Sequence, residues 1–240
     1  MQALTGNPAP FNFRVAGHKI ARISDFSARD PHLWPVEYLD WTDFIAPEIE
    51  ALAPASIVHG GYAYFFSLLR HGTDGAGGRG NILTRISIDA MNQPDGRFEY
   101  LGRDGRWNKK LIPGDARIIF PDGVSELSVR YHAEDGLWMA VYLSPAGRGE
   151  KLLFSTSKTL EGPWSAPVPF DKTIGEVDPG SPLYDADTFC YAGKEHQQFS
   201  SGRDLVVTYV CNSVGAPDHP QSFLRQNLFL YRPQVLIIRH

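Results

Sequence analysis

The chain has 240 residues, of which 42% are hydrophobic and 12% aromatic, and it carries a formal net charge of −4. A chain of this size can bury a core without disulfides or metals. Its 23 Lys and Arg residues are scattered rather than gathered into a stripe, so we expect no nucleic-acid partner. No apolar run reaches the roughly 18 residues that span a bilayer, and residues 1–13 lack the pattern of a signal peptide, so we expect no membrane partner.

Short runs rich in β-branched and aromatic residues, separated by Gly, Asp, Asn and Pro, fill most of the chain and predict β-strands. The 18 prolines and 23 glycines are spread along the sequence and leave little room for long helices. Residues 42–52 are the best helical candidate, because apolar residues recur there near the helical period, with Pro47 in the first turn. The predicted strands cover residues 11–23, 55–69, 81–88, 125–131, 137–143, 151–157, 189–199, 205–211 and 227–238.

Three predicted hairpins share one design, in which a strand turns at a glycine and returns as a second strand. The turn glycines are Gly61, Gly136 and Gly202. Two further strands follow each hairpin, so each unit is expected to be a four-stranded meander, with residues 228–231 and 235–238 completing the last one. Since one meander cannot bury both of its faces alone, serial meanders favour a β-propeller, in which neighbouring sheets cover one another. A β-sandwich is the alternative.

We therefore expect an all-β chain that forms a single propeller-type domain over residues 1–240. Its units would be a partial one at 1–54 and three more at 55–120, 121–187 and 188–240. A closed ring usually needs at least four blades, so either the first unit is degenerate or the chain is part of a longer protein, which we favour. An incomplete ring would leave strand edges unpaired, and a homo-oligomer would then cover them.

Cys190 and Cys211 are the two cysteines, and they lie on predicted neighbouring strands. They either form a disulfide or serve as small core residues, and we favour free thiols. The compartment is left open, with an extracellular or periplasmic place favoured for the full-length protein. Neither a zinc-type ligand spacing nor a Gly-x-Ser-x-Gly nucleophile elbow occurs, so we expect no metal and no cofactor.

In a propeller, the innermost strand of each sheet lines a central channel whose mouth is the usual ligand site. Glycoside hydrolysis needs two carboxyl groups beside the scissile bond. Glu126 and Glu195 are the pair on the predicted innermost strands and are our catalytic candidates. A solvated strand end and a surface salt bridge are their respective alternatives. Neighbouring residues face opposite ways, so only one of Glu195 and His196 can face the channel.

Further residues are candidates for substrate binding. Ser56 and Gln198 lie on innermost strands, and Gln198 can hydrogen-bond a sugar but cannot shuttle a proton. His196 would orient a carboxylate or, alternatively, be a core residue. Trp107 lies in a predicted loop and would stack on a sugar ring unless it packs into the core, where we also place Trp138 and Trp164.

Residues 126–129, the Glu-Gly-Pro-Trp-Ser-Ala-Pro-Val run at 161–168, the strand at 191–196, and Asn212 together resemble a known family. They are similar to the C-terminal two thirds of bacterial five-bladed propellers classed as a domain of unknown function. That group is related to arabinanase-like glycoside hydrolases, and some members are endo-acting enzymes on D-arabinan. The resemblance runs from about residue 11 to residue 239.

The resemblance implies a glycoside-hydrolase-like propeller that acts on, or binds, a furanose-containing polysaccharide at the channel mouth, with Tyr191 among the substrate-binding residues. The chain departs from the family pattern in two ways. Family members carry a further N-terminal blade with acidic residues that face the cavity, and we expect this chain to begin after it; in addition, one motif differs. The family usually reads His-Pro-Glu where this chain reads His196, Gln197 and Gln198, so an amide replaces a carboxylate. That change favours the alternative, a non-catalytic carbohydrate-binding or protein-interaction propeller.

Overall fold

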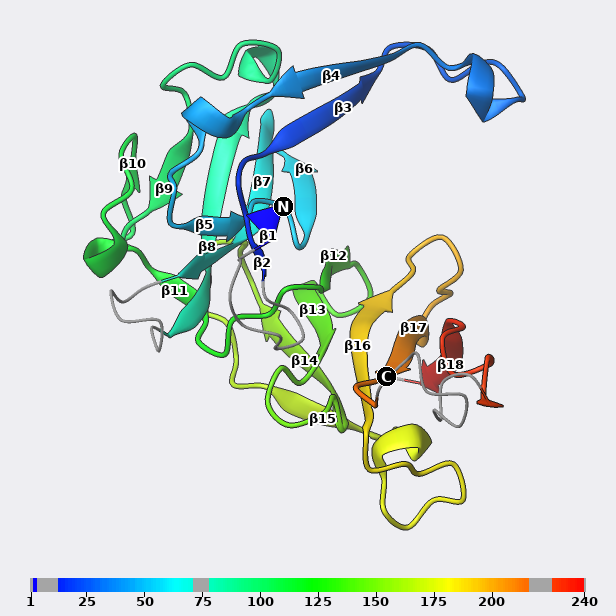
Figure 1. Cartoon of the computed structure of the whole chain (residues 1–240). Helices are drawn as coiled ribbons and strands as arrows, with labels where there is room; N and C mark the ends of the chain where they lie inside the picture. The colour runs from blue at the N-terminus through cyan, green and yellow to red at the C-terminus, as the bar shows by residue number, and fades with distance from the viewer. Residues whose placement is uncertain (1, 4–12, 71–77, 216–225, 240) are drawn as a thin grey trace.

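The structure is a computed structural model that describes residues 2–3, 13–70, 78–215 and 226–239. Its elements are β-strands joined by loops and short 3-10 helices, which confirms the all-β prediction (Figure 1). The strands form three main antiparallel sheets and two small two-stranded ribbons. The shorter ribbon pairs β1 (Gln2–Ala3) with β2 (Phe13–Arg14).

The first sheet is built around β7 and β8, most of whose residues are buried. The nearly continuous apolar run of β7 is typical of a strand that is covered on both faces. The order is β10-β9-β8-β7-β5, with β6 paired to β7 and β11 paired to β8. The seven strands are β5 (Ile49–Ala51), β6 (Ser56–His59), β7 (Tyr62–Arg70), β8 (Arg79–Ser87), β9 (Glu99–Leu101), β10 (Trp107–Asn108) and β11 (Ile118–Phe120).

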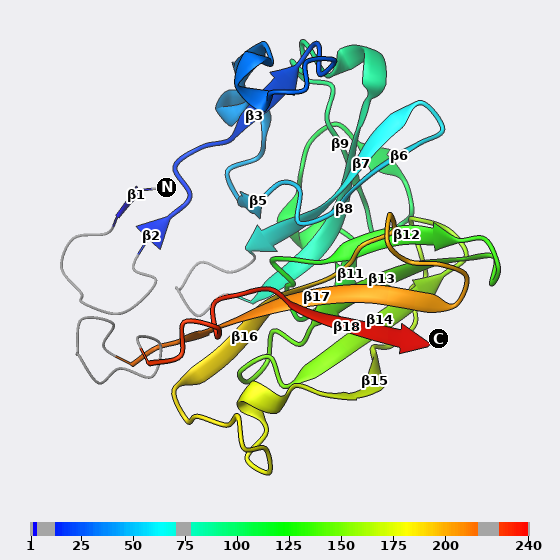
Figure 2. The same ribbon diagram turned by 90° about the vertical axis from the view of Figure 1, so that its right-hand side faces the viewer.

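The middle sheet and the third sheet follow in chain order. The middle sheet is a four-stranded meander of β12 (Ser128–His132), β13 (Leu137–Leu143), β14 (Lys151–Ser157) and β15 (Val168–Thr173). The third sheet has three strands, β16 (Thr188–Glu195), β17 (Asp204–Ser213) and β18 (Gln234–Arg239), which can be followed in Figure 2.

The third sheet corrects two sequence-based expectations. Residues 228–231 form a turn rather than a strand, with the amide of Leu230 donating to the carbonyl of Asn227, so β18 pairs directly with β17. Pro233 follows this turn and has no amide hydrogen for a strand ladder. In addition, β16 ends at Glu195, and a turn occupies residues 197–199, where the sequence predicted a continuing strand.

The middle sheet buries both of its faces, because β13 is apolar at every position. Met139 and Val141 pack with the third sheet, whereas Ala140 and Tyr142, on the opposite face, pack with the first sheet. The three sheets are therefore stacked in series, with two packed interfaces instead of the single interface of a two-sheet sandwich. The described residues do not form a closed ring, and the division into propeller blades stays a prediction.

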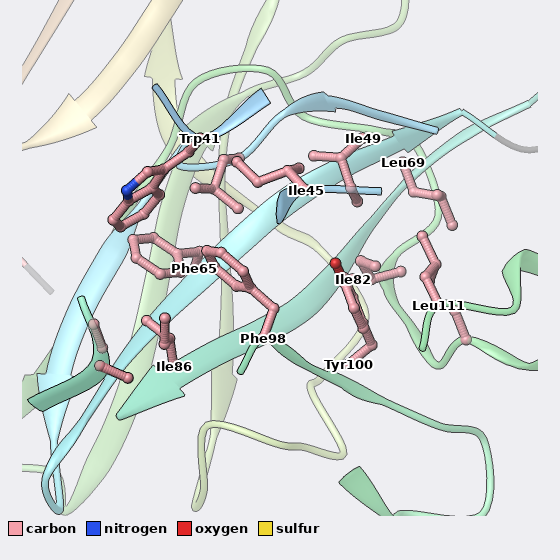
Figure 3. Packing of buried hydrophobic residues seen from close by; sticks show 14 residues of the cluster. Trp41, Ile45, Ile49, Phe65, Leu69, Ile82, Ile86, Phe98, Tyr100 and Leu111 are labelled. Carbon is pink, nitrogen blue, oxygen red and sulfur yellow. The ribbon is translucent and has the colours of Figure 1, made fainter. Parts of the chain in front are cut away.

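The far face of the first sheet is covered by the segment that precedes it. The helix expected at residues 42–52 is absent; a 3-10 turn at Thr42–Phe44 and strand β5 replace it. Pro47 would have interrupted a helix, and an extended path lets Trp41, Ile45 and Ile49 all pack on the sheet (Figure 3). The other 3-10 helices are Pro31–Leu33, Ile88–Ala90, Pro113–Asp115 and Gly175–Val177.

An N-terminal ribbon, which we call the arm, projects from this region (Figure 1). It pairs β3 (Lys19–Ile23) with β4 (Val36–Asp40). The sequence predicted one strand over residues 11–23; the structure has β2 and β3 there, and residues 11–12 lie outside the described residues. The part of the chain that the structure describes contains no helix with the length and hydrophobicity of a membrane span.

Cys190 and Cys211 form a disulfide, so the expectation of free thiols was wrong. The register of β16 on β17 places the two residues directly opposite each other, and both are buried. Their apolar surroundings suit small core residues as well as a disulfide, and only the register decides between the two.

We predict that replacing both cysteines by Ala lowers the free energy of unfolding by roughly 2–4 kcal/mol, because the cross-link no longer restricts the unfolded chain. The two residues are separated by 21 positions. Urea denaturation followed by circular dichroism measures the change. A reductant should lower the midpoint of the wild type and leave that of the double variant unchanged. If the reductant has no effect on the wild type, the cross-link does not contribute to stability.

Candidate functional site

Three strands from three different sheets meet at their inner edges. β12 contacts both β6 of the first sheet and β16 of the third (Figure 1). Two hollows lie where β12 and the residues that precede it, 123–127, face β16 and the turn that follows it. The first, of about 270 Å³, is called the Glu126 hollow, and its polar lining includes Arg79, Ser125, Glu126, Ser144, Arg148 and Tyr191. The second, of about 370 Å³, is called the Glu195 hollow, and its polar lining includes Ser56, Ser128, Arg130, Lys194, Glu195 and Gln198.

Glu195 lies at the centre of a buried polar cluster that joins the middle and third sheets. Nε of Arg130 donates to Oε1 of Glu195 at 2.7 Å, and the terminal nitrogen Nη2 of Arg130 lies 2.6 Å from the same oxygen. Nε2 of His132 lies 3.3 Å from Oε2. The amide of Glu195 donates to the Ser128 hydroxyl at 2.7 Å. Ser128, Arg130 and His132 alternate along β12 and so share one face of the strand.

The surroundings of Glu195 keep its carboxylate ionised. Burial acts to raise the pKa of Glu195, but the hydrogen bonds with His132 and Arg130 and the charge of Arg130 outweigh it and lower the pKa to about 2. A carboxylate with this pKa donates no proton near neutral pH. In this arrangement Glu195 holds Arg130 and His132 in position and forms part of the wall of the hollow.

Glu126 lies in different surroundings. It is half-buried at the edge of its hollow, and among the described residues no ion pair reaches its carboxylate. Tyr191 lines the same hollow. Burial, the neighbouring Tyr231 hydroxyl and the negative charge of Glu126 raise the pKa of Tyr191 to about 12. Its hydroxyl therefore stays protonated at neutral pH and can donate a hydrogen bond to a ligand.

The structure brings five of the seven predicted site residues to the two hollows and leaves two elsewhere. Ser56 and Gln198 are exposed and line the Glu195 hollow. His196 lines neither hollow, and its Nε2 hydrogen-bonds the Thr208 hydroxyl at 2.7 Å. Trp107 also lines neither; the Arg85 guanidinium stacks on its ring at 4.0 Å. Trp138 and Trp164 pack against the core, as predicted.

The partners of Glu195 were not recognised in the sequence. Ser128 and Arg130 lie in the predicted strand at 125–131, and His132 directly follows it, all at the same parity as Glu126. In the structure β12 begins at Ser128, so Glu126 precedes the strand on which it was predicted. The period-2 alternation of a strand could have placed all four on one face. It could not have shown that Glu195, some sixty-five positions away in the chain, packs against that face.

One further cluster, in the part of the chain that the structure describes, joins Glu176 to the two cysteines. Both sulfur atoms belong to the disulfide, so they offer no thiolate to a metal ion. The Tyr209 hydroxyl donates to Glu176 at 3.0 Å, and burial together with this carboxylate raises the pKa of Tyr209. This cluster is a hydrogen-bonded part of the core.

No protein-family model matches the sequence, and no curated protein matches it. Solved structures do resemble the chain. One is a "putative hydrolase" from Bacteroides ovatus, with a TM-score of 0.59, 16% identity, and coverage of 92% of this chain and 52% of that one. The chain thus spans about half the length of that protein and shares its fold. A mutant of the GH43 protein BlXynB from Bacillus licheniformis matches at a TM-score of 0.29 with 18% identity, covering 66% of this chain and 36% of that one, which is too loose to support an argument.

We predict that Glu195→Gln lowers the free energy of unfolding by about 3–5 kcal/mol at neutral pH, because it leaves Arg130 without its buried counter-charge. The exposed pair of Asp204 and Arg239 supplies the control, since Asp204→Asn should cost about 1 kcal/mol or less. Denaturation with urea compares the two. Equal losses in both variants would contradict a structural role for the cluster.

The wild type and Glu195→Gln also test how the contribution of Glu195 to stability depends on pH. Because folding lowers the pKa of Glu195 from 4.5 to about 2, its contribution is fully present above pH 4.5 and is lost as the pH falls toward 2. The stability difference between wild type and Glu195→Gln should therefore shrink over this interval. A difference that stays constant from neutral pH down to pH 2 would show that the carboxylate is not held ionised.

Proposed function

We propose that the chain binds a furanose-containing polysaccharide of the arabinan type along β12 and β16. One observation carries the proposal: hydrogen-bonding side chains from three sheets converge on two adjoining hollows. Ligand sites in proteins are concave and hold a few convergent polar groups. Glu126, Tyr191, Ser56 and Gln198 would supply acceptors and donors for sugar hydroxyls.

The choice of sugar is supported by the sequence resemblance to arabinanase-like propellers. The fold shared with the Bacteroides ovatus protein, whose name is that of a hydrolase, is compatible with a glycoside-hydrolase-like chain. The fold likeness names no substrate, so the sugar is supported by the sequence resemblance alone and is the part of the proposal that the experiment tests first.

Binding is favoured over hydrolysis by the state of the two carboxylates. Hydrolysis needs a proton donor and a second carboxylate beside the scissile bond. Glu195 is ionised and engaged by Arg130 and His132, and Glu126 is the other carboxylate in the linings of the two hollows. Hydrolysis is the second candidate function, with Glu126 as the acid or base. It is favoured by the observation that Glu126 has no ion-pair partner among the described residues.

We predict that Glu126→Gln weakens arabino-oligosaccharide binding about tenfold, because a charge-assisted hydrogen bond to a sugar hydroxyl becomes a neutral one. Isothermal titration calorimetry measures the affinity. Glu134→Gln makes the same chemical change at an exposed position outside both hollows and should bind like the wild type.

An assay for new reducing ends, run on the same mixtures, separates binding from cleavage. Binding without new reducing ends supports the binding proposal. Cleavage that disappears in Glu126→Gln would instead establish hydrolysis. Failure of the wild type to bind arabinan, or equal affinity of wild type and Glu126→Gln, would contradict the proposal.

A further inference from the structure

The third sheet has one covered face and one open face. Along β17, Leu205, Val207 and Tyr209 are buried against the middle sheet. The residues between them point the other way because side chains alternate along a strand. On β18 the outward residues are Val235 and Ile237, which are 62% and 67% exposed.

The open face is continuous and carries no charge at its centre. The register pairs Thr208 with Val235 and Val206 with Ile237. On β16, the Phe189 and Tyr191 rings stack at 5.6 Å beside the same strand. The charged side chains that share this face are Lys194, which lies opposite Thr208 on the edge strand β16, and the ion pair of Asp204 and Arg239 at the end of β17 and β18. Contiguous apolar faces of this kind on a protein surface mark interaction sites.

The loop that leads into β18 extends the open face. Tyr231 lies beside Tyr191, with which it interacts, and it is exposed, as are Leu228 and Phe229. Five apolar side chains of the face and loop have this exposure, namely Val235, Ile237, Leu228, Phe229 and Tyr231, and they leave roughly 100 Å² each open to water, or about 500 Å² per copy. A two-fold dimer would then bury about 1,000 Å² in total, which is the lower bound for a specific interface.

We propose that this face is a dimer interface, in which two copies of the chain pack their third sheets against each other about a two-fold axis. The central residues of the face carry no charge, so two copies can pack there without bringing like charges together. Face-to-face packing of β-sheets is also how the three sheets of one copy already pack. A two-fold contact uses the same patch on both copies and closes at two.

The arm of a neighbouring copy is the alternative candidate for covering the open face of the third sheet. One face of the arm presents Ile23, Val36 and Tyr38, all exposed. If the arm of one copy covered the third sheet of the next, the contact would join two different surfaces and would build chains of copies rather than a closed dimer. The two arrangements therefore differ in the mass of the assembly. The dimer proposal does not rest on the proposed function, because Val235 and Ile237 line neither hollow. Phe189 and Tyr191 do line the Glu126 hollow, so a dimer formed through this face would border that site.

Sedimentation velocity and light scattering of the full chain over a range of concentrations test the proposal. We expect a concentration-dependent dimer of twice the 26.7 kDa chain mass. Ile237→Lys should weaken dimerisation about 100-fold or more, since it buries a charge without a partner. Ile112→Lys is the matched control, because Ile112 is an isoleucine that is 54% exposed outside the third sheet, and it should leave the dimer intact.

Far-UV circular dichroism and the urea midpoint check that both variants fold. A wild type that remains monomeric at every concentration would overturn the proposal and leave the face to another protein or segment. Equal dimerisation of Ile237→Lys and Ile112→Lys would place the interface elsewhere. A series of species larger than the dimer would favour the arm and also overturn the two-fold arrangement.

Discussion

The middle sheet must bury both of its faces, and this requirement holds the other two sheets in place. A strand that is apolar at every position, as β13 is, cannot leave either face in water without losing the hydrophobic contribution to folding. The first and third sheets are therefore held on opposite sides of it. That stacking brings the inner edges of all three sheets together, and the two hollows lie along this line of contact.

The polar cluster around Glu195 lies at this same line of contact. Apolar side chains dominate the sheet interfaces but do not fix how far one sheet slides along another. A buried ion pair adds little net stability, because desolvation offsets the attraction, yet it penalises every alternative register that would separate the charges. We interpret the pairing of Glu195 with Arg130 and His132 as a contact that specifies how β16 lies on β12. The same pairing leaves Glu126 as the less constrained carboxylate of the site.

The third sheet is the least covered of the three, since it has three strands and packs on one side. The disulfide between β16 and β17 strengthens this sheet from within. Pairing of two third sheets would bury its remaining apolar face in the same way as the faces of the middle sheet are buried.

The all-β class, most of the strands and the serial hairpins could be predicted from the sequence, because alternation and turn glycines such as Gly61 and Gly136 are local signals. The sequence also placed Glu195 on the strand that became β16 and required that Glu195 and His196 face opposite ways, but it placed Glu126 on a strand that begins only at Ser128. Tertiary packing was needed to establish that Glu195 faces inward, that Cys190 pairs with Cys211, and that Trp107 packs beneath Arg85. Each of those outcomes depends on a partner strand or loop distant in the chain, and contacts of that range leave no mark on local periodicity.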